Sequence, residues 1–259
     1  FYIKKILNLK IFSNMKNYFF FYNYVFCASL EGEKKEYTNS DTKLIYGHSL
    51  DYDNFLKKKN LNKNLNKNFF LFTDQYLPHH NAYASREIPP FVTADKYYKS
   101  INKFFYYLEE KYKIKIIISA HPRSKYNLIG NKFEGRKIVN YTETEKYTAL
   151  SKGVINYSST SMSYAVIYKK PLIFYTTNEL INSHDAYHVN FLSKQTGSTL
   201  INIDKIDSKN KINDKYLMHV NKYKYKIFFD KYIKHTLSDN TNNFKKILDI
   251  IKIWKKKFI

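Results

Sequence analysis

The sequence predicts an α/β protein built on a parallel sheet with helices on both faces. Between residues 68 and 204, short apolar runs of strand length alternate with helical segments. This alternation is typical of parallel sheets, because parallel strands need crossover connections between them. The chain has 259 residues, of which 44% are hydrophobic, so it can bury a core and is not expected to be disordered throughout.

The first strand of this region is expected at residues 69–73. Residues 94–112 carry apolar side chains at helical spacing, which predicts an amphipathic helix. Residues 114–119 are almost continuously apolar, as expected for a strand covered on both faces. The later elements are strands at 137–139, 153–157 and 171–175, and helices at 144–151 (capped by Thr142 or Thr144) and 161–168.

The chain divides into four segments. Because its first residue is Phe1 rather than Met, we expect a fragment or a processed form. Residues 244–254 carry one apolar stripe and are expected to pack back onto a domain. The segments are a partial N-terminal α/β domain (1–58), a Lys- and Asn-rich linker (59–67), the main nucleotide-binding sheet domain (68–204) and a C-terminal helical extension (205–259).

The net charge of +22 has two interpretations that the sequence leaves open. One is compositional bias, since the chain is rich in Lys, Asn, Tyr and Ile and poor in Gly and Pro. The other is an anionic partner, such as a phosphorylated substrate or an anionic membrane surface. Arg residues are few, the Lys residues are scattered, and no nucleic-acid-binding module is recognisable. We therefore expect no nucleic-acid partner.

The cysteine content and the apolar segments predict the cellular location of the protein. Cys27 is the single cysteine, which excludes an internal disulfide, and no Cys/His set suggests structural zinc. Residues 18–27 are apolar but shorter than the ~20 residues that cross a bilayer, so we expect them in a core. With no apparent signal peptide, the prediction is a cytoplasmic protein. For Lys255–Lys257, a solvated end and a peripheral contact with the inner membrane both stay open.

Polar residues follow the predicted strands where α/β folds bind ligands, past the carboxyl ends of the strands. His121, Pro122 and Arg123 come directly after the strand at 114–119. His121 can donate a hydrogen bond to a phosphate and Arg123 adds a cationic donor. The alternative is a structural histidine in a tight turn.

Four hydroxyl side chains in a row follow the strand at 153–157. One of them suffices to cap the next helix, and capping alone is the alternative interpretation. Four together favour a phosphate site, because free backbone N–H groups and hydroxyls meet there. These residues are Ser158, Ser159, Thr160 and Ser161.

Candidate general bases follow two other strands. Asp74 lies at the end of the strand at 69–73, where it could deprotonate an acceptor hydroxyl. His48, Asp51 and Asp53 follow a strand ending near residue 46, and either Asp is an alternative base. Capping or a polar turn explains these residues equally well. His79 and His80 could line the same crevice, but their adjacency is not metal-ligand spacing, so no metal site is expected.

Several catalytic motifs are missing. The chain has no GxGxxG, no GxxxxGK[ST] and no GxSxG. A dinucleotide redox cofactor, a P-loop NTPase and an α/β-hydrolase are therefore not expected, and no cofactor is predicted beyond an activated donor.

The pair His121-Pro122 and Ser158-Ser159-Thr160-Ser161 resembles the HP and SS/ST motifs of bacterial GT-B sialyltransferases and polysialyltransferases. In that family these motifs hold the phosphate of a CMP-sugar, and an acidic pair supplies the base. Asp74-Gln75 is the nearest match and lacks the second acid. The resemblance implies a GT-B-like, Rossmann-type donor half, covering about residues 68–180, with residues 1–58 on the acceptor side.

Two further resemblances touch the same region. Residues 154–159 and 170–175 also look like the CDP-glycerol glycerophosphotransferases of teichoic acid synthesis. Residues 48–53 and 133–136 look like transferases of capsule and O-antigen loci. The families share the fold and, for the first two, a cytidine-nucleotide donor.

The resulting hypothesis is metal-independent, inverting transfer of a sialic-acid-like sugar from a CMP-activated donor to a surface glycan of capsule or lipopolysaccharide. Asp74 is the expected base, His121 stabilises the leaving phosphate, and the four hydroxyls bind it. The alternatives are a CDP-glycerol-type or sugar-phosphate transferase, and an inactive scaffold in a capsule-assembly complex.

Overall fold

The computed structural model describes residues 24–32, 38, 40–58, 67–80, 82–183, 185–206 and 217–258. Its centre is a six-stranded sheet in which every pairing is parallel. The α/β class and the parallel sheet predicted from the sequence are therefore confirmed. Nearly all of the predicted linker, residues 59–66, lies outside the described residues. The strands are β3 (Phe69–Thr73), β4 (Lys115–Ser119), β5 (Ile138–Val139), β6 (Gly153–Asn156), β7 (Leu172–Thr176) and β8 (Thr199–Asn202).

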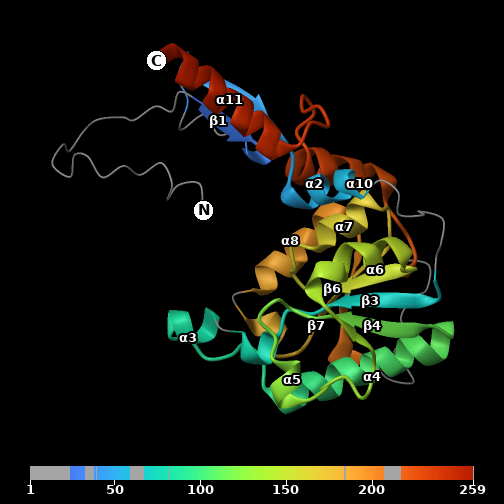
Figure 1. Ribbon diagram of the computed structural model, residues 1–259. Helices are drawn as coiled ribbons and strands as arrows, with labels where there is room; N and C mark the ends of the chain where they lie inside the picture. Colours follow the sequence, from blue (N-terminus) through green and yellow to red (C-terminus); the bar gives the residue numbers. More distant parts are fainter. Residues whose placement is uncertain are drawn as a thin grey trace.

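The order of the strands is β5-β4-β3-β6-β7-β8. Along the chain, β4 and β5 are added on one side of β3, and β6, β7 and β8 are then added in order on its other side. The direction of winding therefore reverses between β3 and β6, which is where open α/β sheets bind their ligands. Figure 1 shows this sheet beneath α6 and α7 and above α4.

Alternation along β3 places helices on opposite faces of the sheet. Phe70 packs against Tyr112 of α4 (Ala94–Tyr112), with ring centroids 6.3 Å apart. Its neighbour Phe69 packs against Tyr147 of α6 (Thr144–Leu150), at 5.9 Å. Because successive strand side chains point to opposite faces, α4 and α6 cover different faces. All five residues of β3 are buried, which explains the uninterrupted apolar run.

Most predicted elements fall within a residue or two of the observed ones, and the helix predicted at 94–112 has those bounds. The predicted caps are not observed. Glu143, not Thr142 or Thr144, is the N-cap of α6, and it makes no capping hydrogen bond through its side chain. Asn140 instead accepts from the backbone N–H of Thr142 at the preceding 3-10 turn. The remaining elements of the main domain are η3 (Leu77–His79), α3 (Ala82–Arg86), α5 (Tyr126–Ile129), η4 (Tyr141–Glu143), α7 (Met162–Ile167), η5 (Leu180–Asn182), α8 (Ala186–Thr196) and η6 (Ile203–Lys205).

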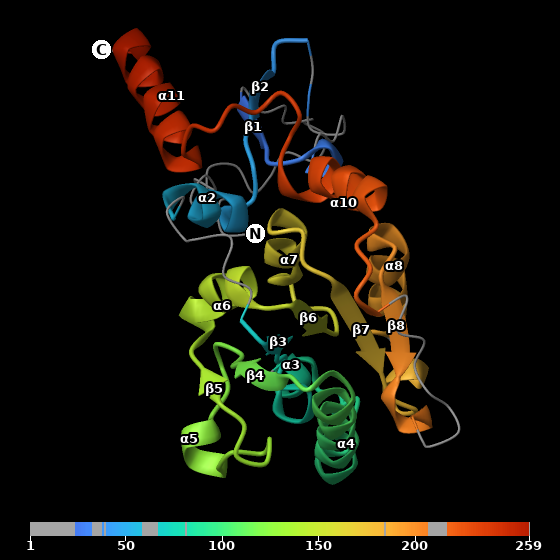
Figure 2. The same ribbon diagram turned by 90° about the vertical axis from the view of Figure 1, so that its right-hand side faces the viewer.

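The N-terminal and C-terminal parts of the chain lie together at one end of the molecule (Figures 1 and 2). A backbone bridge joins His48 to Lys234, and the rings of Tyr46 and His235 stack at 4.2 Å. The carboxylate of Asp53 then links the two parts through side chains, as described below. The elements there are β1 (Tyr24–Cys27) paired in parallel with β2 (Lys43–Tyr46), η1 (Leu30–Gly32), α2 (Leu50–Lys57), α10 (Lys222–Phe228), the π-turn η7 (Phe229–Ile233) and α11 (Asn243–Phe258).

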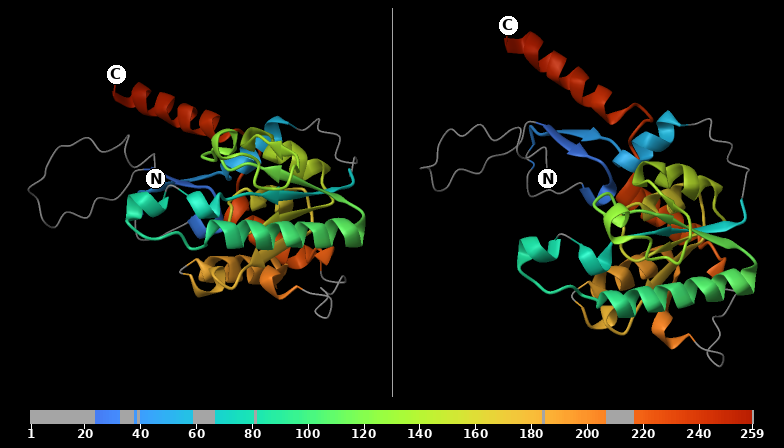
Figure 3. Two further views of the ribbon diagram at one scale, coloured as in Figure 1. Left: turned by 90° about the horizontal axis from the view of Figure 1, so that it is seen from below. Right: turned by 60° about the horizontal axis from the view of Figure 1, so that its bottom comes forward.

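The last helix differs from its prediction. The helix exists, but α11 projects away from the sheet domain rather than packing back along it (Figure 3). Phe244, Leu248 and Ile251 are 73%, 45% and 44% exposed. An amphipathic pattern specifies which face is apolar but not what covers it, so the predicted packing is wrong for these residues. Among the described residues, no helix has the length and apolarity that a membrane span requires.

Candidate active site

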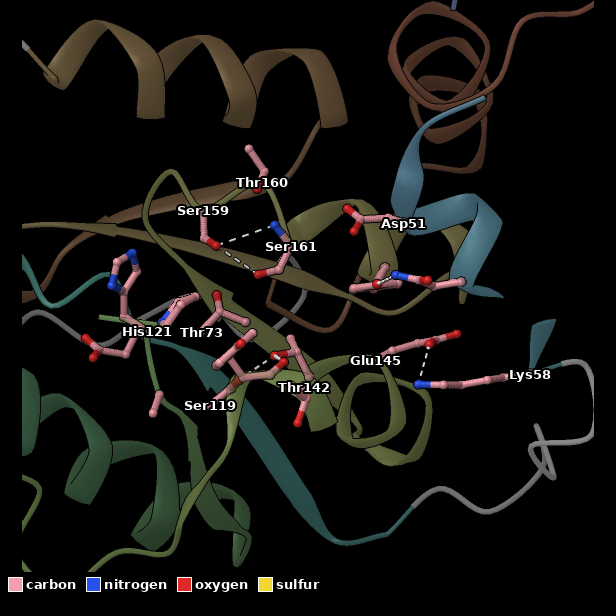
Figure 4. Close-up of a pocket in the computed structure, with 17 residues that line it drawn as sticks. Asp51, Lys58, Thr73, Ser119, His121, Thr142, Glu145, Ser159, Thr160 and Ser161 are labelled. Carbon is pink, nitrogen blue, oxygen red and sulfur yellow. Dashed lines mark hydrogen bonds and ion pairs between the residues drawn. The ribbon is translucent and has the colours of Figure 1, made fainter. Parts of the chain in front are cut away.

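A cavity of about 560 Å³ opens at the carboxyl ends of β3, β4 and β6 (Figure 4). β4 and β6 are the two neighbours of β3, so the segments that follow them face each other across the end of β3. His121 comes from the first segment, and Ser159, Thr160 and Ser161 come from the second; all four line the cavity. The convergence predicted from the sequence is therefore observed.

His121 is held with one ring nitrogen facing its own loop. The backbone N–H of Arg123 donates to Nδ1 of His121 at 3.2 Å. A nitrogen that accepts cannot carry the proton of the neutral ring, so the proton lies on Nε2. Burial, with the neighbouring His80 and Arg123, lowers the pKa of His121 to about 4. At neutral pH the ring is therefore an uncharged donor through Nε2.

Asn156 holds the hydroxyl segment against β3. This side chain is completely buried, and its Nδ2 donates to Oγ1 of Thr73 at 2.7 Å. Its Oδ1 accepts from the backbone N–H of Ser159 at 3.1 Å. The hydroxyls of Ser159 and Ser161 lie 2.8 Å apart. The position of the hydroxyls is thus fixed by the strand beneath them, whereas Ser161, the N-cap of α7, makes no capping hydrogen bond through its side chain.

Ser158 lies apart from the other three hydroxyls. Its backbone N–H and its Oγ both donate to Oε1 of Gln75, at 3.3 and 3.2 Å. It does not contribute to the lining of the 560 Å³ cavity in the described part of the chain. Asp74-Gln75 is the nearest match to the acidic pair of the resembled family. In this pair, the side-chain amide of Gln75 positions the hydroxyl segment.

The carboxylate of Asp74 borders the cavity but is fully engaged. It is 4% exposed; Oδ1 accepts from the backbone N–H of Tyr76 at 2.9 Å, and Oδ2 accepts from the hydroxyl of Tyr126 at 2.6 Å. Burial raises the pKa of Asp74 to about 6, despite these hydrogen bonds, which favour the charged form. Both oxygens thus already have donors within the protein.

Asp51 enters the cavity from α2, on the opposite wall (Figure 4). Its Oδ2 accepts a hydrogen bond from the hydroxyl of Ser163. Burial raises its pKa above the ordinary value, opposed by hydrogen bonds from Ser163 and Tyr164. Asp51 is half-buried, so its carboxylate is more accessible than that of Asp74.

His48 and Asp53 form a structural junction. His48 is 1% exposed, and its Nε2 lies 2.7 Å from Oδ1 of Asp53. The amide of Asn243 donates to the backbone carbonyl of His48 at 2.7 Å, and that of Asn242 donates to Oδ2 of Asp53 at 2.7 Å. These contacts join the start of α2 to the start of α11, and in the described part of the chain neither His48 nor Asp53 lines the cavity, so their substrate-binding role stays a prediction.

The other predicted residues lie at the edge of the site. Pro122 lines the cavity, whereas Arg123 is exposed, lies outside the cavity lining in the described part of the chain, and contacts His121 through its backbone N–H, so its role as a cationic donor stays a prediction. The ring of His80 lies 5.1 Å from that of His121, and His79 is exposed. In the described part of the chain, neither His79 nor His80 lines the cavity.

Several lining residues escaped the sequence analysis. Ser119 and Thr144 share a hydrogen bond of 2.6 Å beneath His121. Glu145, which is buried, pairs with Lys58 at 3.0 Å at the far end of the cavity (Figure 4). Polar residues inside apolar runs or helices carry a weak signal, because capping and surface exposure explain them equally well. Across the described residues, no group of three or more His, Cys, Asp or Glu side chains is placed to hold a metal ion.

Comparison with known proteins gives fold likeness only. No family model matches the chain, and no curated protein matches its sequence. The wall teichoic acid polymerase TagF superposes with a TM-score of 0.54 at 12% identity, over 91% of this chain and 59% of that one. Its H548A variant gives 0.51 at 13% identity, with the same coverage of both chains. The UDP-GlcNAc 2-epimerase of Methanocaldococcus jannaschii gives 0.38 at 17% identity, over 73% of this chain and 54% of that one.

The strand order and the likeness to the TagF structures define the architecture. It is a GT-B-like, Rossmann-type half with smaller elements beside it, as the sequence predicts. The chain spans less than two thirds of the length of the solved structures it resembles.

Proposed function

We propose that this chain carries the donor site of a transferase that moves a sugar from a cytidine-nucleotide donor to a hydroxyl of a surface glycan. The observation that carries the proposal is that His121 and the residues Ser159, Thr160 and Ser161 line one and the same cavity. It lies where the winding of the sheet reverses, the usual ligand position in such folds.

In this proposal the donor phosphate lies between the imidazole and the hydroxyls. Nε2 of His121 donates to a phosphate oxygen, and the hydroxyls of Ser159 and Thr160 donate from the other side. These donors stabilise the negative charge that collects on the nucleotide as it leaves. The same donors support transfer that needs no metal ion.

The base we propose is Asp51 in preference to Asp74. Both oxygens of Asp74 accept hydrogen bonds from within the protein, whereas Asp51 is more accessible from its cavity wall. Asp51 removes the proton from the acceptor hydroxyl, the oxygen attacks the anomeric carbon of the donor, and the bond to the phosphate oxygen breaks with its electron pair leaving on the nucleotide. Attack from the face opposite the leaving group inverts the configuration.

Glycerol phosphate transfer is the second candidate. The chain resembles CDP-glycerol glycerophosphotransferases in residues 154–159 and 170–175. The fold likeness to the wall teichoic acid polymerase TagF is consistent with it. In that case the attacked atom is the phosphorus attached to glycerol, and CMP is again the leaving group.

A thermal-shift screen with CMP, CDP, UDP and GDP tests the proposal. At a concentration 100-fold above Kd, the ligand should stabilise the fold by about 2.7 kcal/mol. We expect a rise in Tm with CMP or CDP that His121→Ala reduces. Absence of any rise with all four nucleotides contradicts a nucleotide site.

CMP-sialic acid and CDP-glycerol as donors then separate the two candidates. Release of CMP that depends on an added glycan should occur with only one of them. Release with CDP-glycerol alone favours the second candidate, and release with CMP-sialic acid alone favours the first.

A further inference from the structure

A second cavity of about 610 Å³ lies on the other side of the hydroxyl segment. It is bounded by α7, α8, α10 and η7. Figure 2 shows α7, α8 and α10 in the same part of the molecule. Ser159, Thr160 and Asp51 line both this cavity and the first one. We call the second cavity the aromatic chamber, after the three rings described next.

One wall of the aromatic chamber consists of Phe191 from α8, Phe228 from α10 and Tyr232 from η7. The centroids of Phe228 and Tyr232 are 4.8 Å apart, and those of Phe191 and Tyr232 are 6.3 Å apart at 80°. Such contacts hold the rings in fixed positions relative to one another. The wall therefore offers rigid aromatic faces rather than a loose apolar surface.

The lining of the chamber also includes polar groups. Ser49 and Ser163 contribute hydroxyls, and His188 and Asp51 contribute ionisable groups. A mostly apolar lining that includes a few polar groups is typical of sites for small ligands. Sugar rings suit this combination, since they have C–H faces for aromatic rings and hydroxyls for the polar groups.

The charge of the lining selects among sugars. The whole chain has a net charge of +22, yet among the described residues neither lysine nor arginine lines the chamber. A phosphate-bearing polymer would need cationic partners when it leaves water. The chamber therefore suits a neutral sugar.

We propose that the aromatic chamber binds a neutral sugar residue at the end of the acceptor glycan, with its ring against Phe191 and Tyr232 and a hydroxyl beside Asp51. The proposal rests on the proposed function, because the shared residues Ser159 and Thr160 are where the donor phosphate is expected. It adds the class of the acceptor and the surface that recognises it.

Ligand-observed NMR tests binding in the chamber directly. The probes are methyl galactoside and methyl glucoside, with galactose 6-phosphate as an anionic counterpart. We expect saturation transfer to at least one methyl glycoside, with a Kd raised about fivefold by Phe191→Ala and by Tyr232→Ala. Tyr223→Ala is the matched control, because Tyr223 is on α10, 76% exposed and outside the lining.

Phe191→Leu guards against a variant that fails to fold, since it keeps an apolar side chain and removes only the ring. Each variant is compared by its Tm. Probes measured without nucleotide test the chamber alone, and CMP measured without probes tests the donor site alone. A failure of the chamber proposal can therefore be distinguished from a failure of the proposed function.

Three results overturn the inference. The first is an absence of NMR saturation transfer from the wild-type protein to either methyl glycoside. The second is tighter binding of galactose 6-phosphate than of methyl galactoside. The third is unchanged affinity in folded Phe191→Leu and Tyr232→Ala variants.

Discussion

Asp74 should make the protein less stable as the pH rises, and Asp74→Asn should remove that dependence. The carboxyl is buried, and its pKa in the folded state is raised from 3.8 to about 6. A raised pKa means that folding favours the protonated form. The stability that this group contributes is therefore full below pH 3.8 and is lost as the pH rises through about 6.

The size of the effect follows from the rise in pKa. A change from 3.8 to about 6 corresponds to about 3 kcal/mol, since each pH unit is worth about 1.4 kcal/mol. The loss of stability should occur between pH 3.8 and about pH 6. Above about pH 6.5 the difference in stability between the wild type and the Asp74→Asn variant should be constant.

Urea unfolding of both proteins at intervals from pH 3.5 to 7.5 measures this difference. Subtracting the curve of the variant from that of the wild type cancels the other titrating groups. Asp239→Asn is a control of opposite sign, because the hydrogen bond from Lys246 lowers the pKa of Asp239 to about 2. The stability due to Asp239 is present above pH 3.8 and is lost as the pH falls through about 2, so this control is measured from pH 1.5 to 7.5. A difference for Asp74→Asn that stays constant across the range would refute the reasoning.

Four other outcomes are expected. His121→Ala should weaken CMP binding by roughly tenfold in calorimetry, because it removes one hydrogen bond to a charged group. An unchanged Kd would show that His121 does not bind the phosphate. Asn156→Ala should lower the free energy of unfolding by about 2 kcal/mol, because it removes the buried hydrogen bond to Thr73 and the acceptor of the Ser159 N–H. It should also weaken CMP binding, and a loss of stability with full CMP affinity would show that Asn156 does not position the hydroxyls for binding. Asp51→Asn should reduce transfer by at least about a hundredfold while CMP binding persists, and normal turnover would return the role of base to Asp74. Transfer should continue in EDTA, and its loss and rescue by a divalent cation would contradict metal-independent chemistry.

The main sheet was predictable because its strands are buried on both faces. Residues 69–72 and 116–118 are apolar without interruption, and such runs need little tertiary information to be recognised as strands. The convergence of His121 and the hydroxyls was predictable for a related reason. Parallel strands end at one edge of the sheet, so residues directly after them come together whatever the detailed packing.

The separate roles of the three aspartates were not predictable. Asp51, Asp53 and Asp74 all follow a strand, so their positions in the sequence are equivalent. Contacts distant in sequence distinguish them: Asp53 meets Asn243, 190 residues later, and Asp74 meets Tyr126, 52 residues later. Asp51 instead meets Ser163 and stays accessible at the cavity wall.

The most direct test is nitrogen NMR of His121 during titration with CMP, in protein labelled at histidine with ¹⁵N. We expect the Nε2 signal of His121 to shift on binding and the pKa of His121 to rise from about 4, because the phosphate stabilises the charged ring. A Nε2 signal and a pKa that do not change when CMP saturates the protein would contradict the account.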